Sequence, residues 1–145
     1  MNIKIATTFS ADLLAAINRL LPQLSDMALP LTETSLKKML DADTTYLFIA
    51  KDSQGIWGML TLATYRIPTA QRAWIEDVVV DASRRGEGIG KKLMLAAIDQ
   101  AKSNGVTTLE LTSRSTRVEA NKMYQSLGFV LRETNAYRMR FSKNK

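Results

Sequence analysis

A short basic segment rich in glycine, residues 84–92, lies between a strand-like run and a helix-like run. Residues 74–80, before it, are mostly β-branched and apolar, whereas apolar residues recur at helical spacing over residues 93–102. β-branched apolar runs favour strands, and a repeat of three to four residues favours helices. The pattern therefore predicts a strand, a tight loop and a helix in direct succession, which strongly limits the folds open to the chain.

The charges of this loop are unusual for the start of a helix. Unpaired N–H groups and the positive end of the helix dipole normally attract Ser, Thr, Asp or Asn and acidic residues. Here Lys91 and Lys92 fall in the first turn, Arg84 and Arg85 precede it, and only Glu87 opposes them. A phosphate or pyrophosphate would satisfy both the cations and the amides. The alternative is a tight solvated turn with a basic surface.

The glycine spacing separates this loop from two common phosphate-binding loops. Glycine can adopt positive φ and let the backbone approach an anion closely, which gives Gly86, Gly88 and Gly90 a role. A P-loop needs four residues between its glycines and then Lys-Ser or Lys-Thr, and neither is present. The dinucleotide fingerprint needs G-x-G-x-x-G at the end of the strand, whereas several residues separate Val80 from Gly86.

Two segments, residues 85–90 and 117–129, match motifs of a known family. Residues 85–90 read Arg-Gly-Glu-Gly-Ile-Gly, which is similar to the acetyl-coenzyme A loop of the GNAT N-acetyltransferase superfamily: Arg or Gln, two residues, Gly, one residue, then Gly or Ala. Residues 117–129 are similar to a second signature, Asn or Arg, two residues, Ala, three residues and Tyr, followed by Leu-Gly-Phe.

Composition narrows the chemistry. The 145 residues are 46% hydrophobic, enough for the core of a single domain over residues 1–145. Because the chain has neither cysteine nor histidine, disulfides, a cysteine nucleophile, a histidine base and the usual zinc ligands are excluded, and no metal is expected. No signal segment and no apolar run of about 18 residues is present, so a soluble cytoplasmic protein without membrane contact is expected.

The net charge raises nucleic acid as a partner. The chain carries a formal charge of +6 and its pI is near 9.7. The cations gather at residues 84–92, at Arg114 and Arg117, and in residues 132–145, without a long stripe of interleaved aromatic residues. A phosphorylated nucleotide explains the first two groups more economically, so nucleic-acid binding is not the preferred interpretation.

The remaining chain reads as alternating strands and helices. Pro22 is expected to end the first helix, and a capping box formed by Thr116 and Glu119 is expected to open the last one. Strands are predicted at residues 3–5, 46–51, 56–65, 73–80, 107–112, 129–133 and 137–141, and helices at residues 11–21, 33–41, about 88–103 and 116–127. This order resembles the GNAT fold from end to end. It implies an α/β fold with a mixed, mostly antiparallel twisted sheet and helices on both faces.

The resemblance assigns a binding role to several residues. In the family, loop amides hold the pyrophosphate of acetyl-CoA, the pantetheine arm lies along the preceding strand, and a backbone amide near Val79 holds the oxyanion. The cofactor-binding residues expected here are Val78, Val79, Val80, Arg84, Arg85, Gly86, Gly88, Ile89, Gly90, Lys91 and Arg117. Acetyl-CoA is the implied co-substrate.

The resemblance also implies the catalytic residues. Tyr124 corresponds to the tyrosine that protonates the departing sulfur, and a phenol of pKa about 10 suits a thiolate of about 8.5. The alternative is a tyrosine that only packs its helix. Glu76 corresponds to a glutamate that contacts the acceptor and takes the amine proton, directly or through water. Asp77 falls on the opposite face by simple alternation, although a bulge would change that, so Asp77 and water stay open as the base.

The preferred interpretation is an N-acetyltransferase acting on a primary amine of a small molecule or peptide. A binding or regulatory module that has lost turnover is the alternative from a different class. Acidic residues (Asp26, Glu33, Glu76 and Asp77) suit a cationic acceptor, whereas arginines (Arg66, Arg72 and Arg138) suit a carboxylate or phosphate, and the sequence does not choose. By analogy with relatives, a homodimer could pair through residues 137–141.

Overall fold

The computed structural model describes residues 1–142 of the chain. These residues divide between two compact units, Met1–Thr112 and Ser113–Lys145. The prediction of one domain stays a prediction. The elements, in chain order, are β1 (Asn2–Ala6), α1 (Ala11–Leu24), α2 (Glu33–Asp41), β2 (Thr45–Asp52), β3 (Gly55–Ile67), β4 (Ala70–Val80), the 3-10 turn η1 (Ala82–Arg84), α3 (Ile89–Ser103), β5 (Thr108–Leu111) and α4 (Val118–Ser126).

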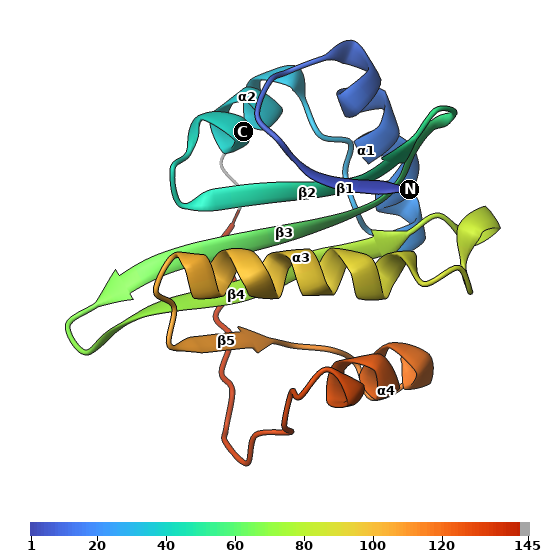
Figure 1. The fold of residues 1–145 in the computed structure, drawn as a ribbon. Helices are drawn as coiled ribbons and strands as arrows, with labels where there is room; N and C mark the ends of the chain where they lie inside the picture. The colour runs from blue at the N-terminus through green and yellow to red at the C-terminus, as the bar shows by residue number, and fades with distance from the viewer. Residues whose placement is uncertain (143–145) are drawn as a thin grey trace. The chain divides into compact units, whose positions relative to one another are not determined.

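The first unit is built on one five-stranded sheet with the strand order β1-β2-β3-β4-β5 (Figure 1). The first four strands pair antiparallel, and β5 runs parallel to β4. The two-residue turn between Asp52 and Gly55 closes the predicted β2–β3 hairpin. The predicted mixed, mostly antiparallel sheet is therefore confirmed.

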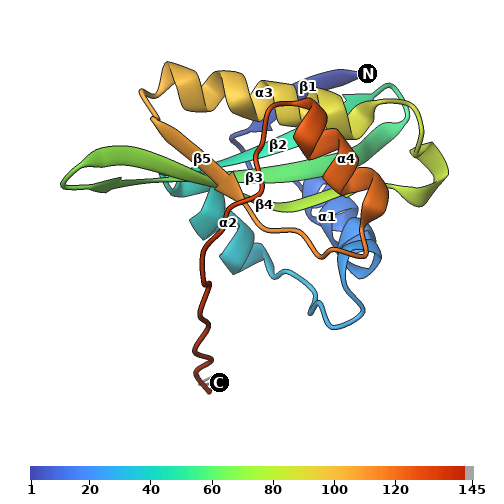
Figure 2. The ribbon, with the colours of Figure 1, turned by 90° about the horizontal axis from the view of Figure 1, so that it is seen from below.

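Helices cover both faces of this sheet, as predicted. Figure 2 shows α3 on one face and α1 and α2 on the other. On the α1 face, Leu13, Ile17 and Leu20 pack in one buried cluster with Leu47 and Ile49. Strand side chains alternate between faces, so the intervening residues of β2 point toward α3. The sheet is thus the central layer that places the end of β4 beside the start of α3.

Helix α1 is longer than predicted. Ser10 caps its start by accepting the Leu13 N–H at 3.0 Å, but the helix continues through Pro22 to Leu24. A proline lacks an N–H and costs most in the middle of a helix, whereas Pro22 lies in the last turn. Gln23 then accepts the N–H of Ala82 at 2.7 Å, which ties this extra turn to the segment after β4.

The second unit contains α4, followed up to residue 142 by a segment without strands. The predicted capping box is wrong, since Arg117 is the N-cap and makes no side-chain cap hydrogen bond. The two strands predicted over residues 129–133 and 137–141 are also absent from the described part of this unit. Alternating apolar residues form a strand only when a neighbour supplies hydrogen bonds, and no register is formed here. The homodimer stays a prediction, although the strand through which it was expected to pair is not formed.

Within residues 1–142, none of the helices has the length and hydropathy needed to cross a membrane.

Candidate active site

The loop between β4 and α3 has the backbone conformation that its glycines predict. Gly86 has φ 82° and Gly88 has φ 78°, both in the left-handed region that other residues rarely adopt. A Cβ atom at either position would meet nothing within 4 Å. The glycines are therefore required by backbone conformation rather than by crowding, and the space beside them is open.

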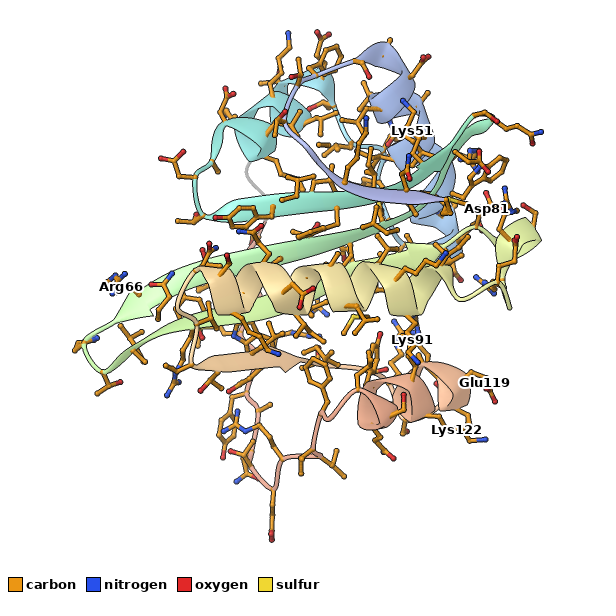
Figure 3. The ribbon with its side chains drawn as sticks, in the orientation of Figure 1. Lys51, Arg66, Asp81, Lys91, Glu119 and Lys122 are labelled. Atoms are coloured by element: carbon orange, nitrogen blue, oxygen red, sulfur yellow. The ribbon has the colours of Figure 1, made fainter. Side chains whose placement is uncertain are left out.

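The start of α3 lacks the usual caps. Gly88 is the N-cap residue without a side-chain cap, and the first turn contains no acidic residue. The first intrahelical bond runs from the Lys92 N–H to the Gly88 carbonyl at 3.1 Å, so the amides of Ile89, Gly90 and Lys91 come before it. Figure 3 labels Lys91 in this first turn. The amides, the helix dipole and the exposed lysine together favour an anion.

Two predicted cations of the loop have different surroundings. The Arg85 side chain is exposed and makes one long hydrogen bond, 3.4 Å, to the Val80 carbonyl. Arg84 instead pairs with Glu87 at 2.7 Å and with Asp52 at 3.1 Å. These two carboxylates raise the pKa of the Arg84 guanidinium. Arg85 is consequently the better placed of the two to meet a ligand, and Arg84 holds the loop to the β2–β3 hairpin.

Asp81 fixes the chain where β4 ends (Figure 3). Its carboxylate accepts the Ser83 hydroxyl at 2.7 Å and the Ser83 N–H at 2.9 Å, and it pairs with Arg19. The bonds from Ser83, followed by Gln23 and the Arg19 charge, lower the pKa of Asp81. The Asp81 N–H donates to the Trp57 carbonyl at 2.7 Å. The direction in which the chain leaves β4 is therefore set by α1 and β3.

Strand β4 is bulged at the predicted base. The β3–β4 register passes from Thr61 opposite Glu76 to Met59 opposite Val79, which leaves one extra residue on β4. The bulge is centred on Asp77, whose φ of 52° is the only positive φ of a non-glycine residue in the described chain. Glu76 and Asp77 are both exposed. The bulge that the sequence analysis considered is therefore present. Simple alternation of side chains along β4 does not decide whether Glu76 or Asp77 is the base.

The edge of β4 beyond the bulge is not paired with β5. The β4–β5 ladder ends at Ile75 opposite Leu111, whereas Val79 and Val80 pair only with β3 in the described sheet. Val79 is buried in the core on the α1 face, and Val78 and Val80 are partly exposed. Strands β4 and β5 are therefore unpaired beyond Ile75 and Leu111, and residues 78–80 lie along the β4 side of this gap.

A partly exposed strip of the sheet adjoins Glu76. Thr61, opposite Glu76, Ala63, opposite Trp74, and Tyr65, opposite Arg72, all fall on the face that carries α1. The Trp74 indole N–H donates to the Tyr65 hydroxyl at 3.1 Å, which confirms that these rings share that face. This strip holds acidic, aromatic and basic candidates for acceptor contacts in one row. Arg66, next to Tyr65 along β3, falls on the opposite face of the sheet.

Tyr124 and Arg117 belong to the second unit. Gly128, with φ 102°, stops α4, and the N–H groups of Gly128 and Phe129 donate to the carbonyls of Gln125 and Tyr124, both at 3.1 Å. This is the pattern of a Schellman cap, in which flanking apolar side chains meet. The Tyr124 and Phe129 rings pack edge to face, with centroids 6.2 Å apart. The Leu-Gly-Phe signature thus has a local role, because it fixes the ring of Tyr124.

Burial raises the pKa of Tyr124, and the nearby Arg117 charge opposes that change. The phenol is therefore protonated throughout the neutral range, as a proton donor must be. No group of three or more acidic side chains in residues 1–142 is arranged to hold a metal ion.

Three residues that position the loop were missed by sequence reasoning. Arg19, Asp52 and Trp57 lie about 30 to 60 positions before the loop that they contact, the separation being 62 residues for Arg19 and Asp81 and 32 for Asp52 and Arg84. Of these three residues, only Asp52 lies in a sequence pattern that we interpreted. That pattern predicted the β2–β3 hairpin turn and did not indicate a contact with the glycine loop.

The strand, the glycine loop and the uncapped helix start are the arrangement that the resemblance to acetyltransferases predicted. The sequence model described as "Acetyltransferase (GNAT) family" matches residues 14–129. The chain therefore belongs to the GNAT acetyltransferase family and is an acyltransferase.

Individual proteins are similar to this chain in sequence or in fold. The [ribosomal protein bS18]-alanine N-acetyltransferase of Haemophilus ducreyi is 37% identical over 57 residues, which cover 39% of each protein, so the match spans about two fifths of that relative. A solved acetyltransferase structure from Agrobacterium tumefaciens has a TM-score of 0.85 at 23% identity, with 97% of this chain and all of that chain covered. A structure described as a transcriptional regulator from Bacillus halodurans has a TM-score of 0.79 at 27% identity, with the same coverage.

Proposed function

We propose that the protein transfers the acetyl group of acetyl-CoA to a primary amine of a small molecule or peptide, by direct transfer in a ternary complex. The observation that carries the proposal is the loop of residues 85–91. It combines two glycines at positive φ with helix amides that precede the first intrahelical bond. This arrangement suits the diphosphate of a coenzyme A thioester.

The remaining cofactor contacts follow from the strand edge. Backbone groups of Val78 and Val80 face the gap beyond the end of the β4–β5 ladder, where an extended pantetheine arm could add hydrogen bonds in the manner of a strand. A backbone amide near Val79 is the proposed donor to the oxyanion that develops on the acetyl carbonyl. Arg85, Lys91 and Arg117 supply positive charge for the phosphates, and no metal is needed for this chemistry.

The proton transfers are assigned to side chains of the protein. The amine nitrogen bonds to the acetyl carbonyl carbon, and the carbon–sulfur bond breaks. Tyr124 gives its proton to the departing sulfur, while Glu76, Asp77 or a water bound by them takes the proton from the amine. A lysine-like amine of pKa about 10.4 is almost wholly protonated at neutral pH, so this second transfer is required.

Calorimetry and an acceptor screen test the proposal. Acetyl-CoA should bind in a one-to-one ratio, and a panel of amines should release free coenzyme A thiol only in the presence of the right acceptor. The panel should include peptides with N-terminal alanine, because the Haemophilus ducreyi relative acts on a ribosomal protein alanine. Absence of heat with acetyl-CoA would contradict the proposal.

A second candidate function is a regulatory module that binds the thioester without turnover. The structure described as a transcriptional regulator, at 27% identity, favours keeping it. Thiol release decides between the two, since a regulatory module would bind acetyl-CoA and release none with any amine.

A further inference from the structure

Two arginines lie close to the indole of Trp57 at the end of the sheet. The guanidinium carbons of Arg19 and Arg84 lie 5.3 and 4.9 Å from its ring centroid, within the range of cation–π attraction. The indole N–H donates to Asp52 at 2.8 Å. These four side chains, with Asp81 and Glu87, are called the Trp57 clamp below.

The Trp57 clamp holds the first half of the loop from two elements. From α1, Arg19 pairs with Asp81 and also donates to the carbonyl of Ile56. From β3, the Trp57 carbonyl accepts the Asp81 N–H. The η1 turn that follows Asp81 is therefore anchored on both sides before any ligand binds.

The contacts of Arg84 in the clamp hold an acidic side chain, Glu87, away from the anion site. Glu87 is the only acidic residue between Gly86 and the end of the first turn of α3, and a carboxylate there would compete for the helix amides. Arg84 instead binds Glu87 at 2.7 Å and is itself held by Asp52 at 3.1 Å. The side chains of Arg84 and Asp52 are about three quarters covered, at 25% and 23% exposure, so this chain of contacts is ordered.

We propose that Asp52 and Trp57, on the β2–β3 hairpin, are positioning residues that preorganise the loop for its phosphate ligand and keep Glu87 away from the amides. The inference rests on the proposed function, since it assumes that the loop binds acetyl-CoA. Neither residue touches the ligand. A loop ordered in advance loses less conformational entropy on binding, so the clamp strengthens affinity without adding a ligand contact.

The carboxylate of Asp52 is charged under all ordinary conditions. Its pKa is lowered from 3.8 to about 2, first by the hydrogen bond from Trp57, then by the Gln54 N–H, with Arg84 contributing less. The clamp is thus intact across the pH range in which an acetyltransferase is assayed.

The test compares Asp52→Asn with Asp43→Asn. Asparagine keeps the shape of Asp52 and an acceptor for Trp57, but loses the charge that holds Arg84. Asp43 is an exposed acid just before the opposite end of β2, so its variant removes the same charge without touching the clamp. Acetyl-CoA affinity, measured by calorimetry, should fall roughly fivefold to tenfold in Asp52→Asn, the size expected for one charged hydrogen bond and lost preordering. It should be unchanged in Asp43→Asn.

Hydrogen exchange in the ligand-free proteins gives a local readout. In Asp52→Asn, the amides of Ala82 and Arg84 should exchange faster, because both donors lie in the segment that the clamp holds, where they bond to Gln23 and to the Asp81 carbonyl. Amides in the middle of β2 and β3 should keep their protection. Asp52→Glu retains the charge and should recover most of the affinity. A general loss of stability would instead speed exchange throughout the sheet.

The outcomes separate the two proposals. If the parent protein gives no heat with acetyl-CoA, the proposed function fails and the inference fails with it. If the parent binds but Asp52→Asn binds equally well, with unchanged exchange at Ala82 and Arg84, only the positioning role is overturned. The role is also overturned if Asp43→Asn weakens binding as much as Asp52→Asn.

Discussion

At the scale of single residues, Tyr124 combines two properties that a proton donor needs. Its phenol is kept neutral by burial, and its ring is fixed against Phe129 by the cap that ends α4. A fixed and protonated hydroxyl loses little entropy when it donates to a departing sulfur. The same contacts would also explain a tyrosine that only packs its helix, so the hydroxyl oxygen itself must be tested.

Tyr124→Phe removes that oxygen and keeps the ring contact with Phe129. We expect kcat to fall by about 10²- to 10⁴-fold, the usual contribution of a general acid, with KM for acetyl-CoA little changed. Thiol release under saturating substrates measures the effect. Tyr137→Phe, at a tyrosine that is 91% exposed, is the matched control and should have normal turnover. Full activity of Tyr124→Phe would assign the residue to packing alone.

The two carboxylates at the bulge are separated by a pH profile. A base is most needed when the amine is protonated, so Glu76→Gln should lower the rate about 100-fold near pH 7 and progressively less toward pH 10, where the amine is already neutral. Asp77→Asn, one residue along the same bulge, is the comparison. Should Asp77→Asn give this profile and Glu76→Gln the parental one, the roles are exchanged. Parental profiles from both variants would leave water as the base.

At the scale of elements, sequence patterns predicted what local rules decide. The glycine spacing predicted the loop, the hydrophobic repeats predicted α1 to α3, and the turn at Asp52 predicted the hairpin. The predicted end of α1 at Pro22 was wrong because the effect of a proline depends on its distance from the helix end. That end is extended by Gln23, which contacts Ala82, 59 residues away. The strands predicted over residues 129–141 failed for a related reason, since a strand requires a partner that its own residues do not specify. The side chains that contact the acceptor could not be predicted from the sequence for the same reason, because their grouping depends on contacts between distant segments.

Gly88 sets the entry into α3, and a substitution there should weaken binding by more than its effect on stability explains. Valine is strained at φ 78°, so Gly88→Val should either distort the loop or rotate its amides away from the diphosphate. We expect acetyl-CoA affinity, or KM, to worsen more than tenfold. Gly105→Val is the matched control, because Gly105 has φ 75° just beyond the other end of α3 and also has open space around its Cβ position.

Both valine variants should lose similar stability, about 1–2 kcal/mol for the left-handed conformation of a non-glycine residue. Thermal unfolding measures this loss of stability, so that the binding of the two variants can be compared at equal fractions of folded protein. Equal loss of acetyl-CoA binding in the two variants would mean that backbone strain in α3, and not the geometry of the loop, controls affinity.

At the scale of the first unit as a whole, the ionic contacts at one end of the sheet link α1, the β2–β3 hairpin and the segment after β4. These elements are distant in sequence, so the contacts form only when the unit folds. Folding therefore depends on pH through them. Asp52 and Asp81 both have a pKa lowered by hydrogen bonds of the folded state, whereas in the unfolded chain they titrate near the ordinary value of 3.8.

The sign of this dependence follows from linkage. A carboxylate whose pKa is lowered on folding stabilises the folded state fully above its unfolded pKa, and the stabilisation disappears as pH falls through its folded pKa. For Asp52 the folded value is about 2. The difference in melting temperature between the parent and Asp52→Asn should thus be constant above about pH 5 and shrink toward zero as the pH approaches 2, because a protonated aspartic acid resembles asparagine. Asp43→Asn should track the parent across this range. A difference that persists undiminished at pH 2 would show that Asp52 stabilises the unit through shape and neutral hydrogen bonds, and that its charge does not hold Arg84.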